Sequence, residues 1–114
     1  MITPRIPKGF RDFLPSTMYL RQRVTDTMRE VFELFGFAPL DTPCIEYAET
    51  LTGKYGEEGE KLMYKFTDKG GRDVALRYDL TIPLSRVMAA HQELIKPFKR
   101  YQIAPVWRAD KPQK

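Results

Sequence analysis

The sequence predicts an α+β fold in which helices flank an antiparallel sheet. Three patterns predict it: an amphipathic helix near the N-terminus, a hairpin with a glycine turn in the middle, and a second helix followed by a strand. The resulting order of helix, strand, hairpin, helix and strand suits a mainly antiparallel sheet. Because 114 residues make one modest domain, we expect residues 1–114 to belong to a single domain.

The first helix is expected between an irregular segment, residues 4–15, and Gly36. Ser16 is a candidate N-cap residue and Gly36 a candidate C-cap residue. Between them, apolar side chains recur every three or four positions, which places them on one helical face. These side chains are Leu20, Val24, Met28, Val31 and Phe35.

Short elements are expected after this helix. Residues 37–42 predict a strand that Pro43 closes, because proline suits the end or edge of a strand. Residues 45–51 predict a short helix. The polar residues 56–60 predict a mobile loop.

The middle of the chain carries a hairpin pattern. Residues 63–67 alternate moderately between apolar and polar, and residues 74–77 form the expected partner strand. The turn between them contains Gly70 and Gly71, and glycine readily supplies the positive φ that such turns need.

A second helix is expected over residues 79–91, with Asp79 or Thr81 as its cap and Pro83 in its first turn. Residues 96–107 predict one long strand, in which Pro105 indicates an edge or a bulge. A polar stretch follows, and we expect the sequence to stop inside a hairpin loop.

The composition argues against several classes of protein. No run of about 18 apolar residues occurs, so no membrane span is expected. The N-terminal residues lack the apolar core of a secretory signal, and the single cysteine, Cys44, cannot form an internal disulfide. These features favour the cytoplasm. One histidine and one cysteine also argue against a zinc site, and we expect no metal ligands in this chain.

Basic residues gather near the C-terminus, whereas the chain as a whole has a net charge of only +4. A solvated edge strand with its tail and a phosphate-binding surface both fit this pattern. The basic residues are Lys96, Lys99, Arg100, Arg108, Lys111 and Lys114, with Asp110 as the only acid among them.

Two places could carry chemistry. Asp79 and Thr81 lie two positions apart at a strand-to-helix junction, where carboxylate and hydroxyl could hold an ammonium group. The alternative is that one of them only caps the helix. Arg108 follows a predicted strand and could present its guanidinium to a phosphate or carboxylate. The alternative is an ordinary exposed arginine.

Residues 8–15 predict a strap that packs Phe10 and Phe13 on the core.

Five stretches, in this order, resemble the histidyl-tRNA synthetases, a family of class II aminoacyl-tRNA synthetases. Residues 6–15 resemble the family's opening. The helix and strand over about 17–43 resemble class II motif 1, and residues 60–68 resemble the strand that follows in the family. Residues 76–81 read Leu-Arg-Tyr-Asp-Leu-Thr, as in the family, and residues from about 98 to 114 resemble motif 2, cut in its loop.

The resemblance implies activation of histidine with ATP and its transfer to tRNA(His). It implies that Asp79 and Thr81 hold the amino group of histidine. Arg108, the implied catalytic residue, would bridge the α-phosphate of ATP and the histidine carboxylate, and Asp110 would face the adenine. Lys111 and Lys114 would lie in the loop that handles ATP and the tRNA acceptor end.

The resemblance also implies a homodimer formed through motif 1 and Mg²⁺ on the ATP phosphates, with metal ligands expected downstream of this sequence. Because the implied active site is incomplete here, we expect no aminoacylation from the 114 residues alone.

Two other functions stay open. The regulatory subunit of ATP phosphoribosyltransferase resembles the same domain and senses histidine without aminoacylating tRNA. Asp79, Thr81, Arg108 and residues 8–15 favour the ligase. The other alternative is a basic nucleic-acid-binding module. It lacks support because no aromatic residues interleave with the basic stretch in a stacking arrangement.

Overall fold

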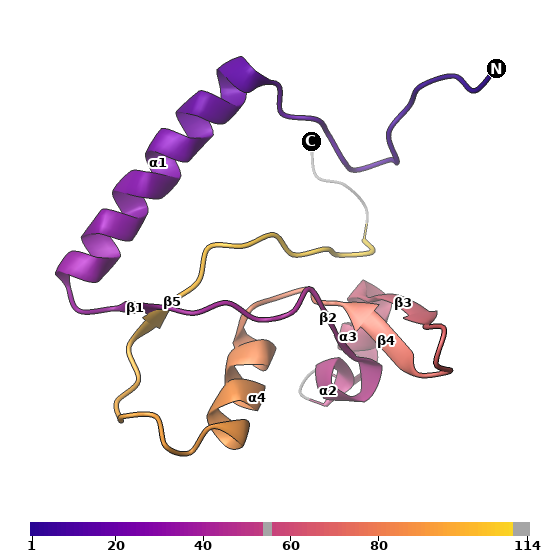
Figure 1. Ribbon diagram of the computed structural model, residues 1–114. Helices are drawn as coiled ribbons and strands as arrows, with labels where there is room; N and C mark the ends of the chain where they lie inside the picture. The colour runs from indigo at the N-terminus through magenta and orange to yellow at the C-terminus, as the bar shows by residue number, and fades with distance from the viewer. Residues whose placement is uncertain (54–55, 111–114) are drawn as a thin grey trace. The chain divides into compact units, whose positions relative to one another are not determined.

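The computed structural model describes residues 1–53 and 56–110 and divides them into two units, Met1–Gly36 and Phe37–Asp110. The elements are drawn in Figure 1. In chain order they are α1 (Pro15–Leu34), β1 (Ala38–Pro39), β2 (Ile45–Tyr47), α2 (Ala48–Thr52), α3 (Gly56–Leu62), β3 (Tyr64–Thr67), β4 (Asp73–Leu76), α4 (Thr81–Ala90) and β5 (Arg100–Tyr101). The predicted α+β class, with an antiparallel sheet, is confirmed.

Helix α1 dominates the first unit. Pro15 is its first residue, a position that needs no backbone N–H, and Leu14 precedes it without a side-chain cap. The predicted N-cap role of Ser16 is therefore wrong, because Ser16 already lies in the first turn. The predicted end is confirmed: Gly36 has φ of 83° and its N–H donates to the carbonyl of Glu33 at 3.0 Å.

The predicted apolar face of α1 exists but remains exposed. Leu20, Val24, Met28 and Val31 are 62%, 54%, 44% and 47% exposed. The strap predicted from residues 8–15 does not bury its rings, since Phe10 and Phe13 are also exposed. The Phe13 ring instead lies 4.0 Å from the guanidinium carbon of Arg21, where a cation–π contact keeps it near the helix.

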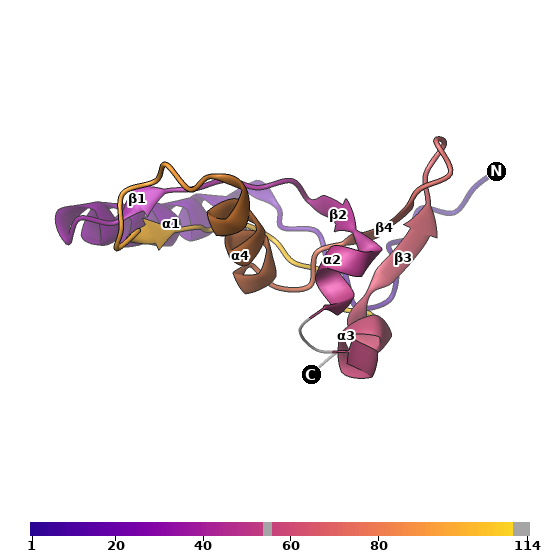
Figure 2. The same ribbon diagram turned by 90° about the horizontal axis from the view of Figure 1, so that it is seen from below.

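The second unit contains a three-stranded antiparallel sheet in the order β2-β4-β3. The predicted hairpin is confirmed as β3 and β4, and Figure 2 shows it projecting beyond α2 and α3. Asp68 organises its turn, because its Oδ1 atom accepts from the N–H groups of Gly70 at 3.0 Å and Arg72 at 2.9 Å. Gly71 supplies the positive φ, 79°.

Three predicted elements need correction. The helix predicted over 45–51 is instead strand β2 followed by helix α2, since the backbone of 45–47 pairs with β4. The loop predicted over 56–60 is helix α3. The strand predicted over 96–107 has only two residues in a ladder, Arg100 and Tyr101, which pair in parallel with β1. Proline at 97 and 105 lacks the N–H that a longer ladder requires.

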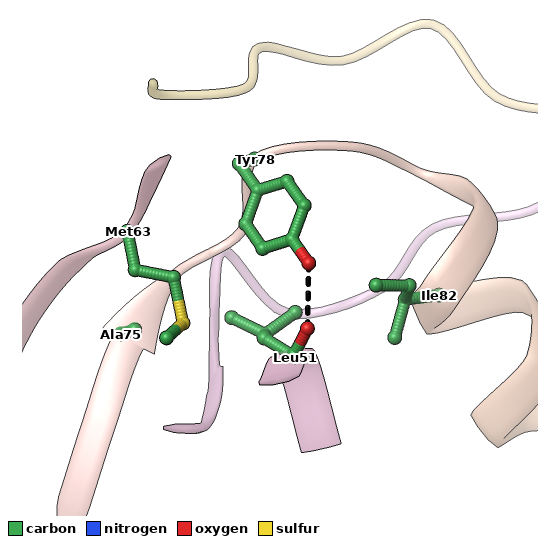
Figure 3. Close-up of a cluster of buried hydrophobic side chains, with 5 residues drawn as sticks. All are labelled: Leu51, Met63, Ala75, Tyr78 and Ile82. Atoms are coloured by element: carbon green, nitrogen blue, oxygen red, sulfur yellow. Dashed lines mark hydrogen bonds between the residues drawn. The ribbon is translucent and has the colours of Figure 1, made fainter. Parts of the chain in front are cut away.

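The core of this unit lies between the sheet and its helices. It consists of Leu51, Met63, Ala75, Tyr78 and Ile82. Figure 3 shows these side chains meeting around the Tyr78 ring, whose hydroxyl donates to the carbonyl of Leu51 at 2.6 Å. That bond satisfies the polar end of an otherwise apolar residue. None of the helices among the described residues has the length and apolar character needed to cross a membrane.

Candidate functional site

The junction between β4 and α4 positions the predicted acidic residue. Tyr78 is anchored in the core, and Asp79 follows it immediately. The Oδ1 atom of Asp79 accepts from the N–H of Ile82 at 3.2 Å, so Asp79 caps the first turn of α4. Capping uses one carboxylate oxygen. The other, Oδ2, has no hydrogen bond to any residue that the structure describes, and it can accept one from a ligand.

Thr81 is the first residue of α4 and is exposed. Its carbonyl accepts from the hydroxyl of Ser85 at 3.3 Å. Because Asp79 provides the side-chain bond to the first turn, Thr81 is not the cap. The side chain is thus placed at the surface, two positions after Asp79.

Arg108 reaches the same junction from the C-terminal segment. Its Nε atom donates to the carbonyl of Tyr78 at 3.1 Å, although the two residues are 30 positions apart. The structure therefore brings Arg108 beside the peptide that leads into Asp79. A guanidinium has five N–H donors, so one bond fixes its position and leaves others for a ligand. A carboxylate beside a guanidinium can bind both charged ends of an amino acid.

Asp110 is not brought to this junction by any hydrogen bond or ion pair among residues 1–53 and 56–110. The preceding residue is held by a bond from the Ala109 N–H to the carbonyl of Leu62 at 2.8 Å, and Asp110 itself is exposed. The predicted loop lysines, Lys111 and Lys114, lie outside the described residues.

Sequence reasoning did not place two further arginines at the junction, although Arg100 was among the basic residues near the C-terminus. Arg77 is only 1% exposed, and Arg100 donates from Nη2 to the carbonyl of Leu80 at 3.2 Å. Arg100 Nε is buried and has no partner in the described part of the chain. A sequence signal for Arg77 was available, because a charged residue stands at the end of an apolar strand pattern. A guanidinium buried there needs its own set of hydrogen-bond acceptors.

A pocket beside the hairpin contains none of the predicted site residues. Its charged members include a close ion pair, in which Arg86 Nε lies 2.6 Å from Oε1 of Glu46, whose side chain is 4% exposed. The pocket is lined by Pro43, Ile45, Glu46, Tyr47, Asp68, Arg72, Val74 and Arg86. We place the candidate site at the β4–α4 junction instead, because the residues with suitable chemistry converge there.

In the hairpin turn, neighbouring groups shift the pKa values of Asp68 and Arg72. The backbone N–H of Arg72 donates to Asp68, and the Arg72 guanidinium lies 2.8 Å from Oδ2. These contacts lower the pKa of Asp68, although partial desolvation opposes them. The negative charge of Asp68 in turn raises the pKa of Arg72. This pair stabilises the turn and lies apart from the junction.

Comparison with known proteins identifies the family of this chain. The sequence profile of the histidyl-tRNA synthetase family matches residues 9–114. Histidine–tRNA ligase of Rhodopirellula baltica is 56% identical over 114 residues, which are 99% of this chain and 26% of that protein. The ligase of Aeropyrum pernix is 57% identical over 113 residues, 97% of this chain and 26% of that protein.

Solved structures point to the same family. Histidyl-tRNA synthetase from a Nostoc species has a TM-score of 0.84 and 36% identity, over 95% of this chain and 26% of that one. A Bacillus halodurans protein described as an ATP phosphoribosyltransferase regulatory subunit/histidyl-tRNA synthetase has a TM-score of 0.84 and 30% identity, over 98% of this chain and 31% of that one.

These similarities define the class, that of the aminoacyl-tRNA synthetases. Within that class, the chain belongs to the histidyl-tRNA synthetase family. It spans about a quarter of the length of the curated relatives named above.

Proposed function

We propose that this chain forms part of the catalytic domain of a histidine–tRNA ligase, which activates histidine with ATP and transfers it to tRNA(His). The observation that carries the proposal is the bond from Arg108 Nε to the carbonyl of Tyr78. It sets an arginine suited to phosphate beside the peptide that leads into Asp79, whose carboxylate is suited to an ammonium group. Membership of the family supports the same reading.

Asp79 and Thr81 are assigned to the amino group of histidine. Asp79 contributes a charge-assisted hydrogen bond through its free oxygen, and the exposed Thr81 hydroxyl adds a second acceptor. Arg108 is the catalytic residue and bridges the α-phosphate of ATP and the histidine carboxylate. Asp110 is assigned to the adenine, and Lys111 and Lys114 to ATP and the acceptor end of the tRNA.

Activation brings two anions together. A carboxylate oxygen of histidine attacks the α-phosphorus, the bond to pyrophosphate breaks, and histidyl-adenylate forms. Arg108, by contacting both anions, lowers their repulsion and stabilises the charge that develops at phosphorus. A terminal ribose hydroxyl of the tRNA then attacks the histidyl carbonyl, and AMP leaves. No side-chain nucleophile is required in either step.

The remaining assignments follow from the resemblance. Residues of about 17–43 correspond to class II motif 1 and form a homodimer interface, and motif 2 begins at about 98. The protein acts in the cytoplasm, where charged tRNA is used.

Mg²⁺ would accompany ATP. Residues 1–53 and 56–110 include no group of three or more His, Cys, Asp or Glu side chains able to hold a metal ion.

The test is histidine-dependent exchange of pyrophosphate into ATP by the full-length protein that carries this sequence. Exchange should appear with histidine and stay at background with tyrosine or lysine. Absence of exchange with histidine, in a preparation that is folded and binds ATP, would reject the ligase.

A second candidate is a regulatory subunit of ATP phosphoribosyltransferase, which the Bacillus halodurans structure favours because its description includes that role. Such a protein would bind histidine without exchanging pyrophosphate. Stimulation of an ATP phosphoribosyltransferase by the full-length protein, with no exchange, would establish this candidate.

A further inference from the structure

Arg77 joins three separate stretches of the chain through one buried side chain. Its Nε atom donates to the carbonyl of Pro105 at 3.0 Å. Its Nη1 atom lies 2.9 Å from the carbonyl oxygen of Thr42 and 3.3 Å from the Thr42 hydroxyl, and 3.4 Å from the carbonyl oxygen of Pro43. The segment before β2, the end of β4 and the C-terminal segment therefore meet at this guanidinium.

The backbone of Arg77 repeats the same connections. Its N–H donates to the carbonyl of Cys44 at 3.0 Å, and its carbonyl accepts from the N–H of Trp107 at 3.0 Å. The guanidinium carbon also lies 5.9 Å from the centroid of the Trp107 ring, within range of a cation–π contact. Arg77 is thus fixed to the residues on both sides of it in space, Cys44 and Trp107.

Burial of this charge is costly for stability alone. Arg77 is 1% exposed, and its hydrogen-bond partners in the described part of the chain are neutral oxygens with no carboxylate among them. A buried cation without a counter-ion is expensive, and an apolar side chain would often fill such a place at lower cost. Lysine cannot reproduce the planar fork that reaches several carbonyls at once. The hydrogen bonds of the Arg77 guanidinium therefore serve to hold the surrounding segments in place.

We propose that Arg77 is a positioning residue that sets the placement of Arg108 relative to Asp79. Asp79 lies two positions after Arg77, and Arg108 lies directly after Trp107, whose N–H bonds to the Arg77 carbonyl. The Pro105 carbonyl is held by the Arg77 side chain. One residue thus fixes both halves of the junction. The inference rests on the proposed ligase function, in which Asp79 holds histidine and Arg108 holds the α-phosphate.

The test is a double-mutant cycle in the full-length protein, read as kcat for histidine-dependent pyrophosphate exchange. Arg77→Met should lower kcat about 100-fold in the wild-type background, because a misplacement of about 1 Å can cost that much. In the Arg108→Ala background the same change should cost less than about threefold, because the guanidinium that Arg77 positions relative to Asp79 is then absent.

Arg77→Lys is the second variant, and Arg72→Met is the matched control because Arg72 is an exposed arginine on the hairpin turn. Arg77→Lys should retain the fold and lose at least tenfold in kcat, whereas Arg72→Met should retain full exchange. An equal cost of Arg77→Met in both backgrounds would overturn the inference, as would full activity of either Arg77 variant. Failure of both Arg77 variants to fold would also overturn it and make Arg77 purely structural. A wild-type protein without exchange would instead refute the proposed function.

Discussion

The Arg108 Nε atom lies 3.1 Å from the carbonyl oxygen of Tyr78, and this hydrogen bond ties the C-terminal segment to the core of the second unit. Tyr78 is itself locked by the bond from its hydroxyl to the Leu51 carbonyl. Arg108 is exposed, yet its position is set by a residue that is 1% exposed. A binding group held in this way keeps its place before a ligand arrives, which reduces the entropy lost on binding.

Asp79→Asn should weaken histidine more than ATP. The substitution keeps an oxygen that can accept from the Ile82 N–H, so the cap of α4 survives. It removes the negative charge that we assign to the ammonium group of histidine. Charge-assisted hydrogen bonds contribute about 1.5–3 kcal/mol, and KM for histidine should rise by roughly 10- to 100-fold. Pyrophosphate exchange at varied histidine and varied ATP measures both constants, and an equal rise in the two KM values would refute the assignment.

Val24→Glu should disrupt the proposed homodimer. Val24 is 54% exposed and lies in the apolar face of α1 with Leu20, Met28 and Val31. A carboxylate there would lose its hydration in a subunit interface, which costs several kcal/mol. Light scattering of the full-length protein should show a dimer for the wild type and a monomer for the variant at micromolar concentration.

Gln22→Glu is the control for that experiment, because it adds the same charge two positions earlier and so on the opposite side of the helix. It should remain dimeric. A monomeric wild type, or equal dissociation by the two substitutions, would show that the apolar face of α1 is not the interface.

Asp68 should titrate below the ordinary range of an aspartate. Its folded-state pKa is depressed by the backbone N–H of Arg72 and by the nearby guanidinium. A carboxyl group whose pKa is lowered on folding stabilises the fold at every pH above its unfolded-state pKa. That contribution is lost as the pH falls through its folded-state pKa. Carbon NMR of side-chain carboxyls, with Asp68→Asn to assign the signal, should give a low midpoint. A midpoint at or above the ordinary value would show that the turn contacts do not form.

Local sequence patterns predicted the elements that local interactions determine. The amphipathic spacing of α1, the glycine at its end and the glycine turn between β3 and β4 each depend on neighbours in sequence. The same holds for the cap of α4, which was expected at Asp79 or Thr81 and is provided by Asp79. These features needed no knowledge of the rest of the chain.

Long-range pairing decided the elements that were predicted wrongly. Residues 45–47 became a strand because β4 offers them a partner. The stretch after Tyr101 has no ladder, and Pro105 within it lacks the N–H that a ladder requires. The acceptors of Arg77 lie as far as 35 positions away in sequence. Spacing along the chain carries no signal for such a set, so the acceptors could be found only in three dimensions. The roles of Asp79, Thr81, Arg108 and Asp110 remain predictions until substrates are tested.

Replacement of Arg108 by alanine tests the central claim most directly. In the full-length protein, Arg108→Ala should lower kcat/KM for histidine-dependent pyrophosphate exchange by about 100- to 1,000-fold, because a preorganised group that stabilises transition-state charge is removed. Arg72→Ala, which removes an exposed arginine elsewhere, should leave exchange unchanged. The contradicting result is exchange at the wild-type rate with Arg108→Ala.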